Sequence, residues 1–253
     1  MPMILIEGSF KILNAAPDGD SIRFYPKDKS LWTRVEGRVR TNRSGGSQLR
    51  LDGIDALETH YQPQRSGLGV LRQPKTFGNE ASQELLKFLG FKNVRRKADE
   101  VVTDSDPDEV PGYIVTRFAD QYGRSVSFVF KGESTEEDGS NVRVTPALIK
   151  KSANVHLLQQ GLAYPTFYSK LYVDLRKTMT EAVVKARSAN QGLWAKDATN
   201  KGFEVETLET LTDEAVILPK LFRRLVDYLA INDGSADLDG FSEYLKSRND
   251  RLI

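Results

Sequence analysis

Short segments with apolar residues at alternate positions dominate the first 130 residues. This pattern restricts the possible folds of the chain more than any other feature of the sequence. Asp18-Gly19 is a hairpin signal, and a second turn signal spans 120–123. The segments predicted as strands are 9–14, 21–25, 48–54, 113–118 and 125–130. Several short strands followed by helices favour a small β-barrel with helices packed on it, which is an α+β fold.

Helices are predicted further along the chain, at 79–89, 155–160 and 172–188, from apolar residues at helical spacing. Gly90 and Gly161 are placed to end the first two. We expect Asn154 to cap the second, because an Asn side chain can accept from a backbone N–H of the first turn. The segment 62–74, rich in Pro and Gly, is predicted as a long irregular loop.

Composition excludes several classes of site. The 253 residues contain 36 Lys and Arg, 35 Asp and Glu, 2 His and no Cys. Without Cys there are no disulfides, thiolate metal sites or cysteine nucleophiles, and two distant histidines argue against a multi-histidine zinc site. A net charge of +1 excludes a protein that attracts phosphate over its whole surface, as histones do, but it is compatible with a local basic cleft.

No stretch approaches the ~20 apolar residues of a membrane-spanning helix, so no membrane partner is expected. The first residues lack the basic start and long apolar run of a signal peptide. The chain as it stands predicts a cytoplasmic protein, and a removed leader would make it a secreted one.

The charge divides the chain into two parts. Residues 201–253 carry 7 basic and 11 acidic residues, whereas the remainder is net basic, and 195–202 reads as a linker. We therefore predict a domain over 1–198 and an acidic helical extension over 199–253, with helices at 218–230 and 238–246. A cap packed on the barrel is favoured over a module that binds a partner.

Four polar motifs stand beside the predicted elements. They are Asp18-Gly19-Asp20, the segment from Arg50 to His60, Tyr122-Gly123-Arg124 and Gln160-Gly161-Leu162-Ala163-Tyr164. Taken singly, they are typical of a turn, a surface ion-pair cluster, a hairpin tip and a helix end.

Taken together, their order and spacing resemble the thermonuclease family, the staphylococcal-nuclease-like domains. The matching blocks are Asp18-Gly19-Asp20-Ser21, Arg50 with Asp55-Ala56-Leu57-Glu58-Thr59, Gly78-Asn79-Glu80-Ala81, Asp120-Gln121-Tyr122-Gly123-Arg124, Gln160-Gly161-Leu162-Ala163 and Asn190-Gln191-Gly192-Leu193-Trp194. These blocks span about residues 8–195 and leave the acidic tail outside.

The resemblance implies a five-stranded OB-type barrel with three helices, and Ca²⁺-dependent hydrolysis of DNA and RNA phosphodiesters, with Mg²⁺ or Mn²⁺ as alternative cations. Asp20 and Asp55 match the family's metal-binding carboxylates, and Ala56 matches the residue whose carbonyl binds the metal. Ala56-Leu57 replaces the usual Thr-Pro, so we expect a less rigid metal loop.

Further roles are implied in the same way. Glu58 matches the proposed general base, and Arg50 and Arg124 match the phosphate-binding arginines. Tyr122 and Gln121 fall at substrate-binding positions, where Gln121 replaces a common Lys. The chemistry is consistent: a hard cation neutralises the phosphodiester, a carboxylate activates water, and guanidiniums stabilise the developing charge.

The alternative is a non-catalytic OB-fold module that binds nucleic acid or protein and is regulated through the C-terminal extension. OB barrels bind single strands by stacking bases on aromatic side chains, which Tyr122, Tyr164, Phe167 and Tyr168 could supply. All five predicted site side chains are present, which favours the enzyme. The tail is then expected either to contact the cleft within the chain or to dock a partner.

Overall fold

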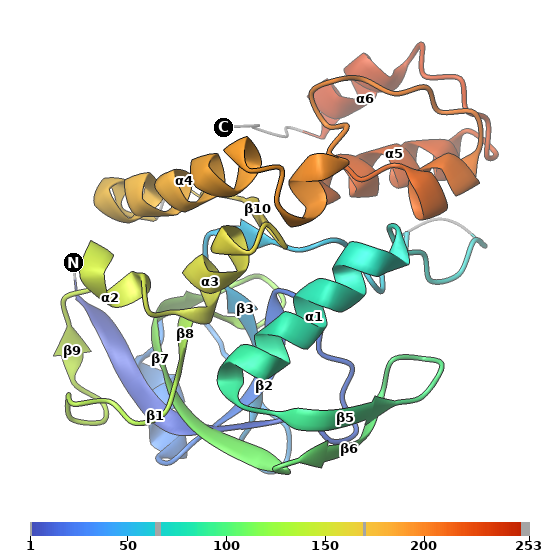
Figure 1. The fold of residues 1–253 in the computed structure, drawn as a ribbon. Coiled ribbons are helices and arrows are strands. Elements are labelled where there is room, and N and C mark those ends of the chain that lie inside the picture. The colour runs from blue at the N-terminus through green and yellow to red at the C-terminus, as the bar shows by residue number, and fades with distance from the viewer. Residues whose placement is uncertain (1, 64–66, 169–170, 249–253) are drawn as a thin grey trace.

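The predicted barrel is present and closed. A computed structural model describes residues 2–63, 67–168 and 171–248 (Figure 1). The barrel consists of β1 (Met3–Lys11), β2 (Ser21–Pro26), β3 (Ser47–Leu51), β8 (Ser125–Lys131) and β7 (Glu109–Ala119), paired in that order. It closes because β7 also pairs with β1. Only the β3–β8 pair of the barrel is parallel. The α+β fold with a five-stranded OB-type barrel is therefore confirmed.

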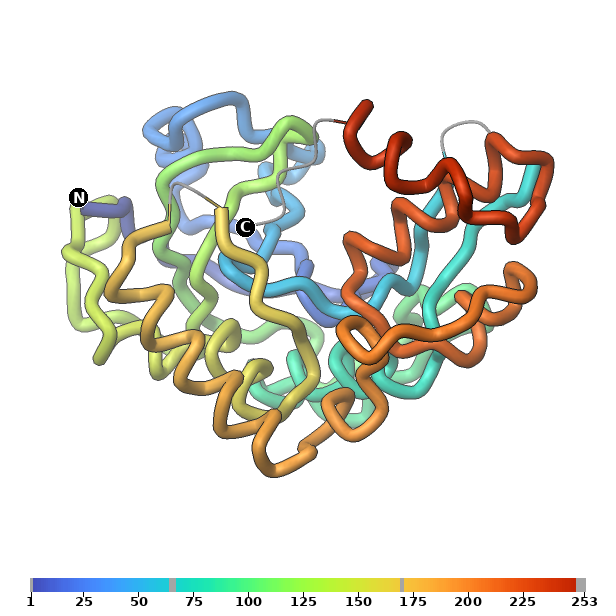
Figure 2. Tube along the Cα trace, turned by 90° about the horizontal axis from the view of Figure 1, so that it is seen from above, coloured from blue at the N-terminus to red at the C-terminus, as the bar shows by residue number. Residues whose placement is uncertain are grey.

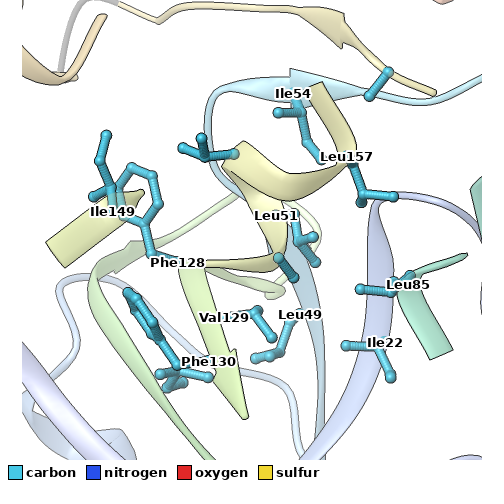
Figure 3. Packing of buried hydrophobic residues seen from close by; sticks show 14 of the residues in the cluster. Ile22, Leu49, Leu51, Ile54, Leu85, Phe128, Val129, Phe130, Ile149 and Leu157 are labelled. Atoms are coloured by element: carbon cyan, nitrogen blue, oxygen red, sulfur yellow. The ribbon is translucent and has the colours of Figure 1, made fainter. Parts of the chain in front are cut away.

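Alternation along the strands explains the barrel's interior. Leu49 and Leu51 on β3 are buried, as are Phe128 and Phe130 on β8. Figure 3 shows these side chains gathered with Ile22 of β2. Because full burial of such a side chain stabilises a fold by about 1.5–3 kcal/mol, this core fixes the strand register.

Three helices pack beside the barrel, as predicted. They are α1 (Lys75–Leu89), α3 (Ala153–Gln159) and α4 (Val173–Ser188), which Figure 1 shows together on one side of the barrel. A fourth, α2 (Pro146–Ile149), is a single turn. The first helix begins at Lys75, four residues before the predicted start, so the block Gly78-Asn79-Glu80-Ala81 lies inside it.

The predicted cap of α3 is wrong. Ser152 caps this helix by accepting from the Val155 N–H, and Asn154 lies inside it. The fully buried Asn154 side chain instead accepts from Val129 N–H and donates to the carbonyls of Asp52 and Ser127. An interior Asn is stable here because backbone groups of the barrel satisfy its amide.

The predicted strand 48–54 is interrupted by Gly53. β3 ends at Leu51, Gly53 turns the chain at φ +75°, and the chain resumes as β4 (Ile54–Asp55), which pairs with β10 (Tyr164–Pro165). A Cβ on Gly53 would lie 2.6 Å from the terminal carbon of Met179. The break changes the direction of the chain just before Asp55.

Smaller elements complete the barrel side. The β5 (Lys92–Arg96) and β6 (Val102–Asp106) strands form a hairpin, and β9 (Asn141–Val142) pairs with β1. Short helical turns cover Lys29–Arg34, Gly192–Ala195 and Thr210–Glu214. In the predicted loop 62–74, Leu71 forms an isolated antiparallel β-bridge with Tyr61, the residue just before the loop. Residues 64–66 of this loop lie outside the described residues.

The C-terminal helices are α5 (Pro219–Ile231) and α6 (Phe241–Ser247), close to their predicted ranges. They share a second apolar cluster, formed by buried residues of 211–229. Tyr61 and Leu71, which follow Glu58, pack against this cluster. The extension therefore rests on the loop after Glu58, while the boundary at 198/199 stays a prediction.

Gly161 offers a test of the packing between the end of α3 and the segment Asn190–Trp194. It has φ +66°, and a Cβ there would lie 2.2 Å from the Gln191 carbonyl oxygen. We expect Gly161→Ala to lower the free energy of unfolding by at least about 3 kcal/mol, since left-handed strain adds to a backbone clash. Gly132→Ala is the matched control, because Gly132 has φ +75° and no atom within 4 Å. Its expected loss is about 1–2 kcal/mol. Equal losses in denaturant unfolding would contradict the clash.

Candidate active site

A cleft of about 580 Å³ lies between one end of the barrel and α5. Its lining comes from the turn before β2, β3, the segment 55–61, the β7–β8 turn, Tyr168 and α5. The structure brings all eight predicted site residues to this lining: Asp20, Arg50, Asp55, Ala56, Glu58, Gln121, Tyr122 and Arg124. Their roles stay predictions.

Asp20 is positioned by a tight turn. Gly19 leaves no room for a side chain, because a Cβ would lie 2.5 Å from the Ala81 Cβ and 2.6 Å from the Ala56 Cβ. The turn therefore seats against α1, and the Asp20 Oδ2 accepts from the Ala56 N–H at 2.8 Å. This bond joins the first predicted metal carboxylate to the backbone of the predicted carbonyl ligand.

Arg50 bridges the two predicted metal carboxylates. Its Nη2 donates to Asp55 Oδ1 at 2.8 Å, and its Nη1 forms an ion pair with Asp20 Oδ2. Both carboxylates are buried, with Asp20 7% and Asp55 1% exposed. Burial alone would raise the pKa of Asp20, but the Arg50 guanidinium holds it below its usual value. Two anions this close and this buried need a cation between them.

The donor set fits a hard metal ion. Asp20 and Asp55 supply carboxylate oxygens around the position of the Arg50 guanidinium, and Ala56 is the adjacent residue on the cleft lining. Within the described part of the chain, no three His, Asp or Glu side chains converge as a larger ligand cluster. With the predicted Ala56 carbonyl as a third ligand, such a site would leave coordination positions for water, as Ca²⁺ allows.

Glu58 is held in the same cleft by its backbone and its side chain. Its N–H donates to Gln73 Oε1 at 3.1 Å, and its carbonyl accepts from the Gln73 N–H at 2.8 Å. The Glu58 carboxylate pairs with Arg223 of α5. Burial raises the pKa of Glu58 to about 7; Arg223 opposes this rise, and the nearby Asp55 adds to it.

The β7–β8 turn orients Arg124. Asp120 Oδ1 accepts from the N–H groups of Tyr122 and Arg124, and its Oδ2 accepts from Arg124 Nε at 2.7 Å. The guanidinium carbon lies 5.6 Å from the centre of the Tyr122 ring, which is 58% exposed. The turn therefore presents a cation and an aromatic face to the cleft, with Gln121 beside them.

The predicted aromatic faces divide into two kinds. Tyr164 is buried and donates to Asp197, and Phe167 packs against the main core. Tyr122 and Tyr168, which is 55% exposed, both line the cleft. Two of the four rings therefore remain accessible for stacking on a base.

Sequence reasoning missed three basic residues of α5: Lys220, Arg223 and Arg224 line the cleft. The Arg223 Nη2 donates to Asp55 Oδ2 at 3.1 Å, and its Nη1 pairs with Glu58. The available signal was their spacing, since positions three and four apart share one face of a helix. Averaging the charge over the whole acidic extension concealed this basic face.

Asp18 and His60 are two further polar residues of the lining. Asp18, predicted only as part of a turn, is beside Asp20, and burial together with that neighbour raises the pKa of Asp18 to about 6. His60 also lines the cleft, with its Nδ1 3.0 Å from the Thr59 hydroxyl.

Comparison of the sequence with known protein families gives a match. Residues 48–196 match the family described as staphylococcal nuclease homologue, a range that contains Arg50, Asp55, Glu58 and Arg124. A search of curated proteins found no match. Among the helices of the described ranges, none has the length and apolar character needed to cross a membrane. Because the match covers more than half of the sequence and its residues build the cleft, the chain belongs to the staphylococcal nuclease homologue family.

Proposed function

We propose that the protein hydrolyses phosphodiester bonds of DNA or RNA in this cleft, with a divalent cation bound. The observation that carries the proposal is the Arg50 bridge between two buried carboxylates, with Glu58 and Arg124 on the same cleft lining. Such a set pairs cation ligands with groups that bind an anion, as phosphodiester hydrolysis requires.

In this mechanism Asp20, Asp55 and the Ala56 carbonyl hold the cation, with Ca²⁺ as the first choice and Mg²⁺ or Mn²⁺ as alternatives. When bound, it supplies neutralisation of the phosphodiester charge. Glu58, three positions beyond Asp55, accepts a proton from the attacking water. The guanidiniums of Arg50 and Arg124 bind phosphate oxygens and stabilise the charge that develops on them.

The non-catalytic binding module is the less favoured function. The exposed rings of Tyr122 and Tyr168 would serve binding and catalysis equally. A binding module has no need of a general base, yet Glu58 lies in the same cleft as the two carboxylates and both arginines.

Metal dependence is the direct test of the proposed function. We expect metal-stripped protein to cleave fluorogenic single- or double-stranded DNA or RNA only after a divalent cation is added, with Ca²⁺ most effective, because the donor set is entirely oxygen. Each substrate is assayed with Ca²⁺, Mg²⁺, Mn²⁺ or excess chelator. Asp104→Asn serves as a control variant, because it removes an exposed acidic side chain outside the cleft and is expected to leave the cation dependence unchanged. Full cleavage in chelator would contradict the mechanism.

A further inference from the structure

The charge of the cleft depends on α5. The part of the lining formed by residues 18–168 contains four acidic residues, Asp18, Asp20, Asp55 and Glu58, and only two arginines, Arg50 and Arg124. Without a bound cation, that part alone would formally repel a polyanionic strand. The α5 helix adds Lys220, Arg223 and Arg224, which makes the basic residues the majority. The extension is acidic overall, but its contribution to the cleft is basic.

The α5 helix is fixed to the site by several contacts. The Tyr61 hydroxyl donates to Asp227 on α5 at 2.8 Å, and the ring centres of Tyr61 and Phe222 lie 6.2 Å apart. The buried Gln73 donates from Nε2 to the Ile217 carbonyl at 2.8 Å while its Oε1 accepts from the Glu58 N–H. One side chain thus ties the backbone of Glu58 to the residues that lead into α5.

Arg223 occupies the centre of this arrangement. It contacts one oxygen of Asp55 and one of Glu58, and a quarter of its side chain is exposed. A guanidinium has five N–H donors in a planar fork, so binding two carboxylates does not exhaust it. The same fork matches the oxygens of a phosphate.

The α5 helix stands opposite the β7–β8 turn. Figure 2 shows α5 and α6, in orange to red, across a gap from the green β7–β8 segment, and the cleft lining includes both sides. A strand in the cleft would therefore pass between Arg124 with Tyr122 on one side and the basic face of α5 on the other.

We propose that α5 forms the second wall of a nucleic-acid cleft and that Arg223 binds a backbone phosphate of the substrate strand. This inference rests on the proposed function for its substrate class. It assigns the C-terminal extension to the substrate site, although the extension lies outside the residues that match the family.

The test is equilibrium binding of a fluorescent single-stranded oligonucleotide in excess chelator, measured over a range of salt concentrations. We expect Arg223→Ala to weaken binding at least about tenfold and to reduce the slope of log Kd against log salt by about one. Arg248→Ala removes the same charge from the same extension, but Arg248 pairs with Asp227 and does not line the cleft. That control is expected to bind as the wild type does.

Unchanged affinity and salt slope in Arg223→Ala would overturn the inference. Tighter binding with faster cleavage would also overturn it, since Arg223 would then be a latch that blocks the carboxylates. If the melting temperature shows that Arg223→Ala does not fold, Arg223→Gln takes its place, with the same expected loss of slope. A different result would contradict the proposed function alone: the wild type would bind the oligonucleotide through Arg223 but cleave no substrate with any cation.

Discussion

Glu58→Gln is expected to lower the single-turnover cleavage rate by roughly 10²–10⁴-fold while the Kd for an oligonucleotide stays within about twofold. Gln keeps the shape of Glu and can still accept from the Arg223 guanidinium, which contacts Glu58 in the structure. It cannot take a proton from the attacking water, so the loss falls on the chemical step.

Single-turnover rate, Kd and melting temperature are measured on one preparation of the Glu58→Gln protein. Glu7→Gln is the matched control, since Glu7 is also largely buried and paired with a cation, Lys27, but lies outside the cleft. Wild-type turnover would remove Glu58 from the mechanism. A joint loss of affinity and melting temperature would assign Glu58 a structural role in holding α5.

Arg124→Lys is expected to lower turnover at least about 10²-fold with little change in melting temperature. Lys keeps the charge but loses the planar fork, and removing one preorganised donor to a developing anion costs about 3–4 kcal/mol of activation free energy. Arg124 lies in a turn at the cleft with a third of its side chain exposed, so the fold depends little on it. Arg117→Lys, whose Glu36 pair lies outside the cleft, is the control.

Arg50→Lys is expected to show the same loss of turnover together with a lower stability. An ammonium cannot reproduce the two-sided bridge from Arg50 to Asp20 and Asp55, and a lost charged hydrogen bond costs about 1–3 kcal/mol. Both predictions are checked by measuring turnover and denaturant unfolding of the Arg50→Lys and Arg124→Lys variants. Near-normal turnover in either would show that its arginine is only an ion-pair partner.

The sequence predicts the part of the site that short-range spacing controls. Arg50, Asp55 and Glu58 fall within nine positions at and after the end of one predicted strand, so short-range spacing alone brings them to the same end of the barrel. Asp20 and Arg124 stand in turns whose Gly and Asp residues are recognisable from the sequence. Asp20, Arg50 and Arg124 lie where barrel strands begin or end, and Asp55 and Glu58 lie in the segment that leaves the barrel after β3, so all five side chains line one cleft.

The remainder of the site depends on tertiary contacts that no local pattern carries. Arg223 reaches Glu58 across 165 positions, and its place is set by apolar packing between α5 and the loop after Glu58. Asn154 was misassigned because a capping preference does not reveal three buried partners on other elements. The break at Gly53 also depends on a neighbour, since Met179 leaves no space for a side chain there.

The double attachment of Gln73 has a consequence for local unfolding. Its amide holds the Glu58 backbone on one side and the Ile217 carbonyl on the other, and Gln73 itself is only 1% exposed. Segments joined in this way open cooperatively rather than one at a time. Fluctuations that detach the C-terminal helices therefore also release Glu58, so the lifetime of the assembled carboxylate site is limited by the docking of residues far beyond it in the chain.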